Sequence, residues 1–228
     1  MAGRFISFEG IDGAGKSTQV RALAATLRAR GQEVVETREP GGSPGAEAIR
    51  ALLVAGETDR WSPETEILLF TAARRDHLER TIRPALARGA TVVTDRFADS
   101  TRVYQGVARA GLRPMVDALH ALAVGLEPDL TLVLDLDPAL AHARGLARAG
   151  AEDRYERMGE DFQARLRQGF IALAAEFPGR CRVVPAGGDP ARPHLGRLAG
   201  AVDALEADEA SRHFPAPVDG PGSRAGEG

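Results

Sequence analysis

The sequence contains little of several residue types, and each shortage excludes a class of protein. Among its 228 residues there is one cysteine, Cys181, so an intrachain disulfide is impossible and a secreted disulfide scaffold is excluded. No apolar run approaches the roughly 18 residues that a membrane span needs. The start, Met1-Ala2-Gly3-Arg4, leads directly into an apolar segment without a signal-peptide core. We therefore expect a cytoplasmic protein with no membrane partner.

Two polar residue types are missing or nearly so. There is no asparagine, and Lys16 is the only lysine among the 29 lysine and arginine residues. At solvated positions lysine and arginine are nearly equivalent, but a site that needs a slim point charge distinguishes them. The composition therefore directs attention to Lys16, although a general bias toward arginine would give the same count.

Neither sign of charge dominates the chain. The 29 Lys and Arg residues stand against 32 Asp and Glu residues, which gives a formal net charge of -3. A protein dedicated to nucleic-acid binding would be clearly basic, so we expect no nucleic-acid partner. With 43% hydrophobic residues the chain can bury a substantial core, and its length suits a single domain.

Short apolar runs alternate with segments of helical periodicity. We expect strands at residues 5–9, 33–37, 91–95, 130–135 and 182–184. We expect helices at residues 16–30, 44–55, 62–86, 97–109, 113–125, 138–148, 160–176 and 191–206. Strands that are apolar on both faces and alternate with helices indicate an α/β fold, with a five-stranded parallel sheet flanked by helices on both faces.

The end of the chain differs in composition from the rest. Residues 207–228 contain three Pro and four Gly, and Phe214 and Val218 are their only bulky apolar side chains. Such a segment buries too little apolar surface to offset the entropy lost on ordering. We expect one domain over residues 1–206, followed by a disordered tail at 207–228.

Residues 10–17 fit the pattern G-x-x-x-x-G-K-[ST] of the P-loop NTPase fold. In such a loop glycines let backbone N–H groups converge on phosphate oxygens, Lys16 reaches the β- and γ-phosphates, and the Ser17 hydroxyl holds Mg²⁺. A chance match in a glycine-rich chain is the alternative, and the placement between an expected strand and an expected helix argues against it. The expected ATP-binding residues are Gly10, Ile11, Asp12, Gly13, Ala14, Gly15, Lys16, Ser17 and Thr18.

A P-loop alone does not name a reaction. A GTPase would carry an N-K-x-D segment, which a chain without asparagine cannot contain, and the Ser-Gly-Gly signature of transport ATPases is also missing. What remains is mainly a kinase of small molecules. If the acceptor is itself a phosphate, its site needs cations, and Arg38 and Asp95-Arg96 follow expected strands. Ligands bind at the carboxyl ends of strands in an open parallel sheet, so we expect these residues to meet the P-loop.

At these residues the sequence resembles the thymidylate kinase family, P-loop kinases that convert dTMP to dTDP. The resemblance covers roughly residues 4–205, and the TREPGG and DR-x(3)-S-x(3)-YQG motifs together are specific to the family. The segments that carry it, in the order and spacing of the family, are FEGIDGAGKST at 8–18, TREPGG at 37–42, LLFTAAR at 68–74, DRFADSTRVYQG at 95–106 and PDLTLVLDLDP at 128–138.

The resemblance implies roles for residues on the acceptor side. It implies that Phe70 stacks on thymine and that Arg74, four residues later on the same helix face, bonds a base carbonyl. Without it, Phe70 would be read as a core residue. Ser100 and Thr101 match polar positions near the base edge. The substrate-binding residues it implies are Asp12, Arg38, Glu39, Phe70, Arg74, Arg96, Ser100, Thr101, Tyr104 and Gln105.

Four of these residues are implied to act on the sugar or the phosphate. Tyr104 matches the residue that crowds the 2′ position and so favours deoxyribose, although a Tyr packed with its hydroxyl satisfied is the competing interpretation. Asp12 matches an acidic residue that faces the sugar 3′-hydroxyl, which explains a carboxylate within a phosphate-binding loop. Arg96, together with Arg38, would hold the acceptor phosphate.

The expected chemistry needs cations more than it needs a base. The nucleophile is a phosphate oxygen of dTMP, whose second pKa is about 6, so it is already mostly ionised at neutral pH. Charge spreads over the transferred group, and positioning and cation placement provide the catalysis. Lys16, Asp95 and Arg96 are the expected catalytic residues, with Asp95 ordering Mg²⁺ through water. The metal residues are then Ser17 and Asp95.

One further arginine is expected near the transferred group. The variable P-loop positions carry no cation. One type within the family supplies this arginine from a mobile lid, and residues 144–157 resemble such a lid, with Arg148 and Arg154 as the candidates. An ordinary charged loop is the alternative. The family also implies a homodimer. The rival functions are another nucleoside monophosphate or deoxynucleoside kinase, and a P-loop switch that binds nucleotide and signals through a partner.

Overall fold

The computed structural model describes residues 3–57, 59–109, 111–146, 159–187, 196, 198 and 200–204. Most of the expected lid, including Arg148 and Arg154, lies outside the described residues, and so does the whole of the expected tail at 207–228. No helix in the described part of the chain has the length and apolar character needed to cross a membrane.

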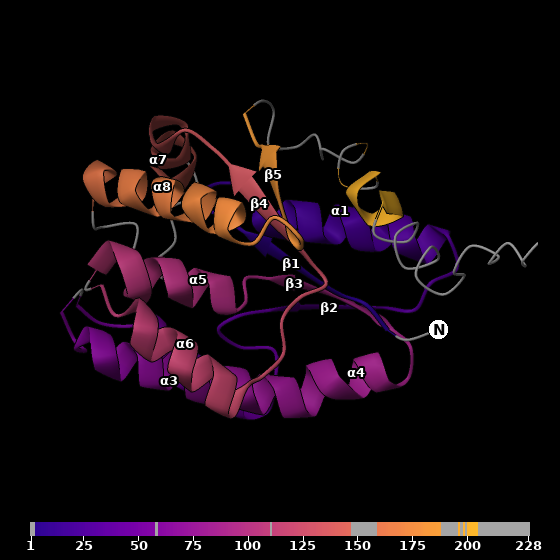
Figure 1. Cartoon of the computed structure of the whole chain (residues 1–228), viewed down its shortest axis with the longest axis horizontal. Coiled ribbons are helices and arrows are strands. Elements are labelled where there is room, and N and C mark those ends of the chain that lie inside the picture. Colours follow the sequence, from indigo (N-terminus) through magenta and orange to yellow (C-terminus); the bar gives the residue numbers. More distant parts are fainter. Residues whose placement is uncertain are drawn as a thin grey trace, which may run out of the picture.

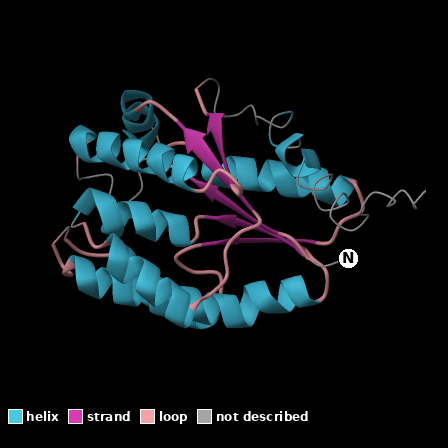
Figure 2. Ribbon diagram, in the orientation of Figure 1, coloured by secondary structure: helices cyan, strands magenta, loops and turns pink. Residues whose placement is uncertain are grey.

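Five parallel strands form one sheet in the order β2-β3-β1-β4-β5. They are β1 (Phe5–Glu9), β2 (Val34–Arg38), β3 (Thr91–Asp95), β4 (Leu130–Asp135) and β5 (Cys181–Pro185). The predicted five-stranded parallel sheet is confirmed. The second strand lies one residue further along the chain than expected, and the fifth is one residue longer at each end. Figure 2 shows the strands in magenta among the surrounding cyan helices.

Helices make up most of the remaining chain. They are α1 (Lys16–Ala29), α2 (Pro44–Val54), α3 (Pro63–His77), η1 (Leu78–Ile82), α4 (Arg83–Ala87), α5 (Ala98–Val103), η2 (Tyr104–Arg109), α6 (Arg113–Ala123), α7 (Pro138–Leu146) and α8 (Glu160–Glu176). Of the expected helix at 191–206, residues 196, 198 and 200–204 are described, and they are helical. The helix expected at 62–86 begins after its Ser62 cap, whose Oγ accepts a hydrogen bond from Thr65 N.

Two expected continuous helices are interrupted by wide π-helical turns, η1 and η2. In the helix expected at 62–86, Pro84 has no N–H to donate, and its ring would press on the carbonyl group of Arg80 if the helix were a regular α-helix. The wider turn of η1, directly before α4, relieves that contact. The second, η2, contains no proline and carries Tyr104 and Gln105. The prediction of single helices over 62–86 and 97–109 was therefore wrong in this respect.

Helices cover both faces of the sheet. Ile6 and Phe8 of β1 belong to the same apolar cluster as Leu23 of α1. Side chains alternate along a strand, so Phe5 lies on the opposite face, where it packs in a second cluster with Leu78 of η1. In the view of Figure 1 the sheet passes between α1 and α8 above and α3, α4 and α6 below. The expected two-sided covering of the sheet is confirmed.

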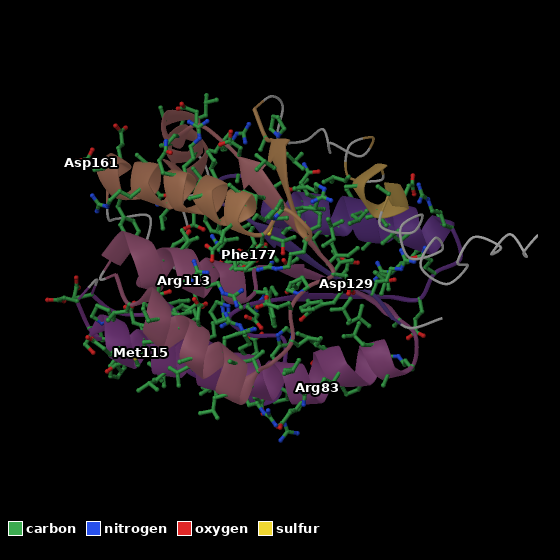
Figure 3. The ribbon with its side chains drawn as sticks, in the orientation of Figure 1. Arg83, Arg113, Met115, Asp129, Asp161 and Phe177 are labelled. Atoms are coloured by element: carbon green, nitrogen blue, oxygen red, sulfur yellow. The ribbon has the colours of Figure 1, made fainter. Side chains whose placement is uncertain are left out.

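A buried ion network links α5, α6 and the start of β5. The Asp99 carboxylate is 1% exposed and accepts hydrogen bonds from Arg102 Nη1 at 2.7 Å and Arg180 Nη2 at 2.9 Å. The guanidinium groups of Arg102, Arg113 and Arg180 also lie over the Phe177 ring, 5.8, 5.9 and 4.6 Å from its centre. Figure 3 labels Arg113 and Phe177 close together near the C-terminal end of α8. This network holds α5, and with it the residues next to Asp99, against the sheet.

Cys181 is the first residue of β5 and belongs to the larger apolar cluster. Its side chain is 4% exposed, and burial raises the pKa of the thiol to about 11. The cysteine is therefore part of the core.

Candidate active site

The loop between β1 and α1 has the backbone geometry of a phosphate-binding loop. Gly10, Gly13 and Gly15 have φ values of 133°, 84° and 87°, a region that suits glycine. A Cβ atom on Gly13 would lie 2.7 Å from the carbonyl oxygen of Ala141, so a larger residue would not fit there. The side chains of Ile11 and Ala14 are buried in the core. The side chains of these two residues therefore do not enter the site.

Lys16 lies in the expected position at the first turn of α1. Its Nζ donates hydrogen bonds to the carbonyl oxygens of Gly10 at 3.2 Å and Ile11 at 2.9 Å, and the side chain is 7% exposed. Burial and the nearby Arg96 lower the pKa of the Lys16 ammonium group. The slim side chain lies along the loop, with its charge held between two backbone carbonyl groups.

Ser17 and Asp95 bring two oxygen atoms together beside the loop. β3 pairs with β1 so that Asp95 lies opposite Phe8, and the Ser17 Oγ donates to Asp95 Oδ2 at 2.5 Å. Among the described residues no group of three His, Cys, Asp or Glu side chains could hold a metal ion. Magnesium in nucleotide sites commonly binds one or two protein oxygens, with phosphates and water completing the set. The hydroxyl and carboxylate therefore fit a Mg²⁺ ion that binds together with ATP.

Arg96 is the centre of a hydrogen-bond network next to the loop. Its backbone has φ of 73°, and its Nη1 donates to Gly10 O at 3.0 Å and to Ser100 Oγ at 2.9 Å. Its Nη2 donates to the Tyr104 hydroxyl at 3.1 Å and contacts Asp12 Oδ1. The Tyr104 hydroxyl in turn donates to Asp12 Oδ2 at 2.9 Å. The Asp12 carboxylate therefore turns toward Arg96 and Tyr104.

The charges of this network explain the ionisation of Asp12. Burial alone would raise the pKa of its carboxyl group, but the positive charges of Arg96 and Lys16 hold that pKa at about 2. Burial also raises the pKa of Tyr104 well above its usual value, so its hydroxyl stays protonated and able to donate. The network is thus a fixed arrangement of charges at neutral pH.

Glu9 is a buried carboxyl group that the sequence analysis did not single out. It is 0% exposed at the end of β1 and accepts hydrogen bonds from Phe97 N at 2.8 Å and Ser100 Oγ at 2.6 Å. Burial and the neighbouring Asp99 raise its pKa to about 8. The available signal was an acidic residue inside an otherwise apolar strand that leads into the P-loop.

Arg74 forms a second cluster, at the end of α3. Its Nε donates to Glu39 Oε2 at 2.7 Å, and both side chains are 4% exposed. Its Nη2 donates to the backbone oxygen of Phe97 at 3.2 Å and to Thr101 Oγ1 at 3.0 Å. Phe70 lies one helical turn before Arg74 and faces the same cavity. The structure thus brings together side chains from three separate motifs.

A cavity of about 530 Å³ joins the loop to the Arg74 cluster. Its lining includes most of the residues that the sequence analysis selected, namely Asp12, Gly13, Gly15, Lys16, Ser17, Thr18, Arg38, Glu39, Phe70, Arg74, Asp95, Arg96, Ser100, Thr101, Tyr104 and Gln105. Gly10, Ile11 and Ala14 are not among the lining residues, because the backbone of Gly10 and the buried side chains of the other two face the protein.

Some lining residues were missed by the sequence analysis. They are Arg21, Pro40, Arg50, Leu53, Val54 and Phe97. Arg50 and the two apolar residues share one face of α2, and Arg50 Nη1 donates to Pro40 O at 2.8 Å. The available signal was the three- and four-residue spacing from Arg50 on the helix that follows the TREPGG segment.

Two further arginines, Arg38 and Arg144, are paired with protein groups in this structure. Arg38 donates to Pro40 O at 3.0 Å and to Glu47 Oε2 at 3.1 Å, while still lining the cavity. In the first part of the expected lid, Arg144 of α7 donates to the carbonyl oxygen of Gly13 at 3.4 Å. The start of the lid segment therefore lies against the phosphate-binding loop.

Comparison with known proteins matches this arrangement to one family. The family model described as thymidylate kinase matches residues 8–191. The thymidylate kinase of Jannaschia sp. (strain CCS1) is 67% identical over 186 residues, which cover 82% of this chain and 89% of that protein. That of Dinoroseobacter shibae is 66% identical over 182 residues, which cover 80% of this chain and 88% of that protein.

A solved structure gives the same result. The crystal structure of thymidylate kinase from Ehrlichia chaffeensis superposes with a TM-score of 0.67 at 35% sequence identity. The match covers 81% of this chain and 93% of that chain. Sequence and fold therefore agree over nearly the same part of the protein.

Proposed function

The chain belongs to the thymidylate kinase family and transfers the γ-phosphoryl group of ATP to dTMP to give dTDP in nucleotide biosynthesis, and from this premise we propose how its own residues carry out the transfer. The observation that supports the proposal is the cavity that runs from the P-loop to the Arg74 cluster. Its two ends suit a donor phosphate and an acceptor base.

The P-loop binds the phosphates of ATP. Its backbone N–H groups and the N-terminus of α1 face the β- and γ-phosphates. The Lys16 ammonium group leaves its backbone partners, Gly10 and Ile11, to contact the phosphates. Ser17, and Asp95 through water, would hold Mg²⁺, which would neutralise charge that develops on the phosphate oxygens.

The acceptor phosphate and sugar lie at the Arg96 network. The guanidinium of Arg96, with that of Arg38, holds the phosphate of dTMP, since guanidinium groups bind phosphate through paired hydrogen bonds. Asp12 accepts a hydrogen bond from the 3′-hydroxyl, and the Tyr104 side chain crowds the 2′ position. This use of Asp12 is consistent with its orientation toward Tyr104 and Arg96.

The thymine base lies against α3. Phe70 stacks on it, and Arg74 donates to a base carbonyl. Thr101 and Ser100 lie near the base edge, and both line the cavity. Glu39 and Gln105 line the same cavity and complete the base pocket.

Catalysis comes from cations placed around the transferred group. The acceptor oxygen is already ionised near neutral pH, because the second pKa of a phosphate monoester is about 6, so no general base is needed. Lys16 and Arg96, which both donate to the carbonyl oxygen of Gly10, place two positive charges next to each other at the reacting phosphates. Arg148 or Arg154, from residues outside the described part of the chain, supplies the further positive charge at the transferred group.

A panel of acceptors tests this assignment. ADP release is measured with ATP, Mg²⁺ and each of dTMP, dUMP, UMP, dCMP and thymidine. We expect dTMP to have the highest kcat/KM. A preference for UMP or thymidine would contradict the acceptor site, and turnover without any added partner excludes a role restricted to nucleotide-dependent signalling.

The protein is a homodimer in this proposal. Leu68 of α3 is 52% exposed and Leu122 of α6 is 85% exposed. The two helices contact each other, with Arg75 Nη1 donating to Ala123 O at 2.8 Å. Two apolar side chains on adjacent helices favour burial against a second copy. Sedimentation equilibrium at micromolar concentration should give twice the chain mass, and a monomer would contradict the proposal.

The place of action is the cytoplasm. The proposal follows from the substrates, since ATP and nucleoside monophosphates are cytoplasmic metabolites. Cell fractionation with detection of the protein tests it, and recovery in an extracellular or membrane fraction would overturn it.

A further inference from the structure

A buried histidine stands directly behind the acceptor pocket. His77 is the last residue of α3 and is 0% exposed, and it does not line the cavity. Its Nδ1 lies 3.0 Å from Glu39 Oε1, and its Nε2 lies 2.6 Å from Thr37 Oγ1. Neither His77 nor Thr37 has a role in binding or transfer as described above.

The hydrogen atoms in this contact can be assigned from chemistry. A carboxylate only accepts hydrogen bonds, so His77 Nδ1 carries a hydrogen and donates it to Glu39. In the neutral ring Nε2 is then the acceptor, and the Thr37 hydroxyl donates to it. The other oxygen of Glu39 accepts from Arg74 Nε at 2.7 Å. Both carboxylate oxygens of Glu39 are therefore held in place, one by each neighbour.

Arg74 is the end of this chain of hydrogen bonds. Its Nη2 donates to Phe97 O and Thr101 Oγ1, and its Nε donates to Glu39. Nη1 has no hydrogen-bond partner within the described part of the chain. Since Arg74 lines the cavity, Nη1 is the group that remains to donate to a ligand. The direction of Nη1 is fixed because the planar guanidinium is anchored through its other two nitrogens.

Gly42 packs closely against the His77 and Thr37 side chains where they meet. Gly42 has φ of 85°, and a Cβ atom there would lie 2.4 Å from both His77 Nε2 and Thr37 Oγ1. The backbone of the TREPGG segment therefore closes over this pair. A histidine packed in this way can hold Glu39 in one orientation.

We propose that His77 and Thr37 are positioning residues that fix Glu39, and through it Arg74, in the orientation that reads the acceptor base. This inference rests on the proposed role of Arg74 in binding a base carbonyl. A guanidinium only donates hydrogen bonds, so a fixed Arg74 favours thymine, which presents carbonyl oxygens, over cytosine, which presents an amino group at the corresponding position. A less firmly held Arg74 discriminates less between the two bases.

The test compares dTMP with dCMP as acceptors in the full-length enzyme. Thr37→Val removes the hydroxyl and keeps the shape, and His77→Asn keeps a donor near the Nδ1 position but loses the contact with Thr37. For both variants we expect kcat/KM for dTMP to fall about fivefold, mainly through KM, with KM for ATP unchanged. The ratio of kcat/KM for dTMP to that for dCMP should fall as well. His77→Leu loses both hydrogen bonds, so it should lower kcat/KM for dTMP more than His77→Asn does.

Two further variants separate the possible outcomes. Thr26→Val is the matched control, because its hydroxyl donates only to Ala22 O within α1 and lies outside the cavity. Arg74→Lys tests the underlying role. If it leaves the dTMP to dCMP ratio unchanged, Arg74 does not read the base, and both proposals fail. If Arg74→Lys lowers the ratio while Thr37→Val and His77→Asn behave like Thr26→Val, only the positioning role is overturned.

Discussion

Single residues in this site hold their charge in surroundings that exclude most water. Lys16, Asp12 and Arg96 are all largely buried, yet each lies within reach of an opposite charge or a polar backbone group. Buried charges are tolerated only when they are paired in this way. The consequence is that substitutions here act on both charge and shape, and the two effects can be separated by choosing variants that change one of them.

Lys16→Arg changes shape while keeping charge. The Lys16 Nζ fits between the carbonyl oxygens of Gly10 and Ile11, and the broader guanidinium fork would not fit in the same space. We expect kcat/KM for ATP to fall about a hundredfold or more with the fold retained, since a misplaced charge no longer stabilises the transition state. Steady-state kinetics with circular dichroism measure both. Arg88→Lys, at an exposed ion pair with Glu33, is the control, and full activity of Lys16→Arg would refute the requirement for lysine.

Glu9→Gln changes ionisation while keeping shape. Its pKa is raised to about 8 in the folded protein, so between the ordinary value of 4.5 and 8 the folded state binds more protons than the unfolded state. Stability contributed by this group therefore falls as pH rises through that range. The glutamine of Glu9→Gln cannot ionise, so the variant lacks this pH dependence. Between pH 5 and pH 8 the free energy of unfolding of the wild type should therefore fall, relative to that of the variant, by on the order of 3 kcal/mol.

Urea unfolding at a series of pH values measures this change. Besides Asp99, the charged groups that influence Glu9 are Arg96 and Lys16, and these remain in the variant. For Glu33→Gln, at an exposed position, the plot of the free energy of unfolding against pH should run parallel to that of the wild type. Parallel curves for Glu9→Gln as well would show that Glu9 is ionised throughout the range.

At the scale of elements, the sequence predicted what depends on local pattern. The P-loop, the strand before it and the helix after it follow from residues 5–30, because apolar spacing and glycine positions are local properties. The π turn at η1 depends on the contact of Pro84 with the preceding turn. Glu9 and His77 were missed for a different reason: each gains its role from a partner distant in the chain, Phe97 for Glu9 and Glu39 for His77, and no local pattern shows such a partner.

The lid is an element whose role can be tested without a description of its conformation. The start of the expected segment lies at α7, where Arg144 contacts the P-loop. We expect Arg148→Ala or Arg154→Ala to lower kcat at least tenfold with KM for dTMP changed far less, because a charge used only in the transition state affects kcat. Arg88→Ala, in an exposed ion pair, is the control. Unchanged kcat in both lid variants would show that neither arginine acts on the transferred group.

At the scale of the whole molecule, the strand order determines which motifs meet. β1 lies between β3 and β4, and β2 pairs with β3, so the ends of β1, β2 and β3 lie side by side. This brings Asp12, Glu39 and Arg96 to one cavity although they are far apart in the sequence. Their convergence at one edge of a parallel sheet could be predicted. The order of the strands could not, because it depends on how all the crossover helices pack together.

Because Cys181 is buried, the rate at which its thiol reacts with a labelling reagent measures how often the protein opens. Only a thiolate reacts readily with disulfide reagents, and a 4% exposed thiol whose pKa is raised to about 11 gives almost none at neutral pH. Labelling should therefore proceed only through molecules in which the β4–β5 edge has opened. Adding dTMP alone at a hundred times its dissociation constant should slow it about a hundredfold if the open form does not bind dTMP. Mass spectrometry of the labelled protein over time measures this rate, and rapid labelling of the native enzyme would contradict it. The labelling rate of the Cys181 thiol thus reports how often the folded protein opens, and how far a bound substrate lowers that frequency.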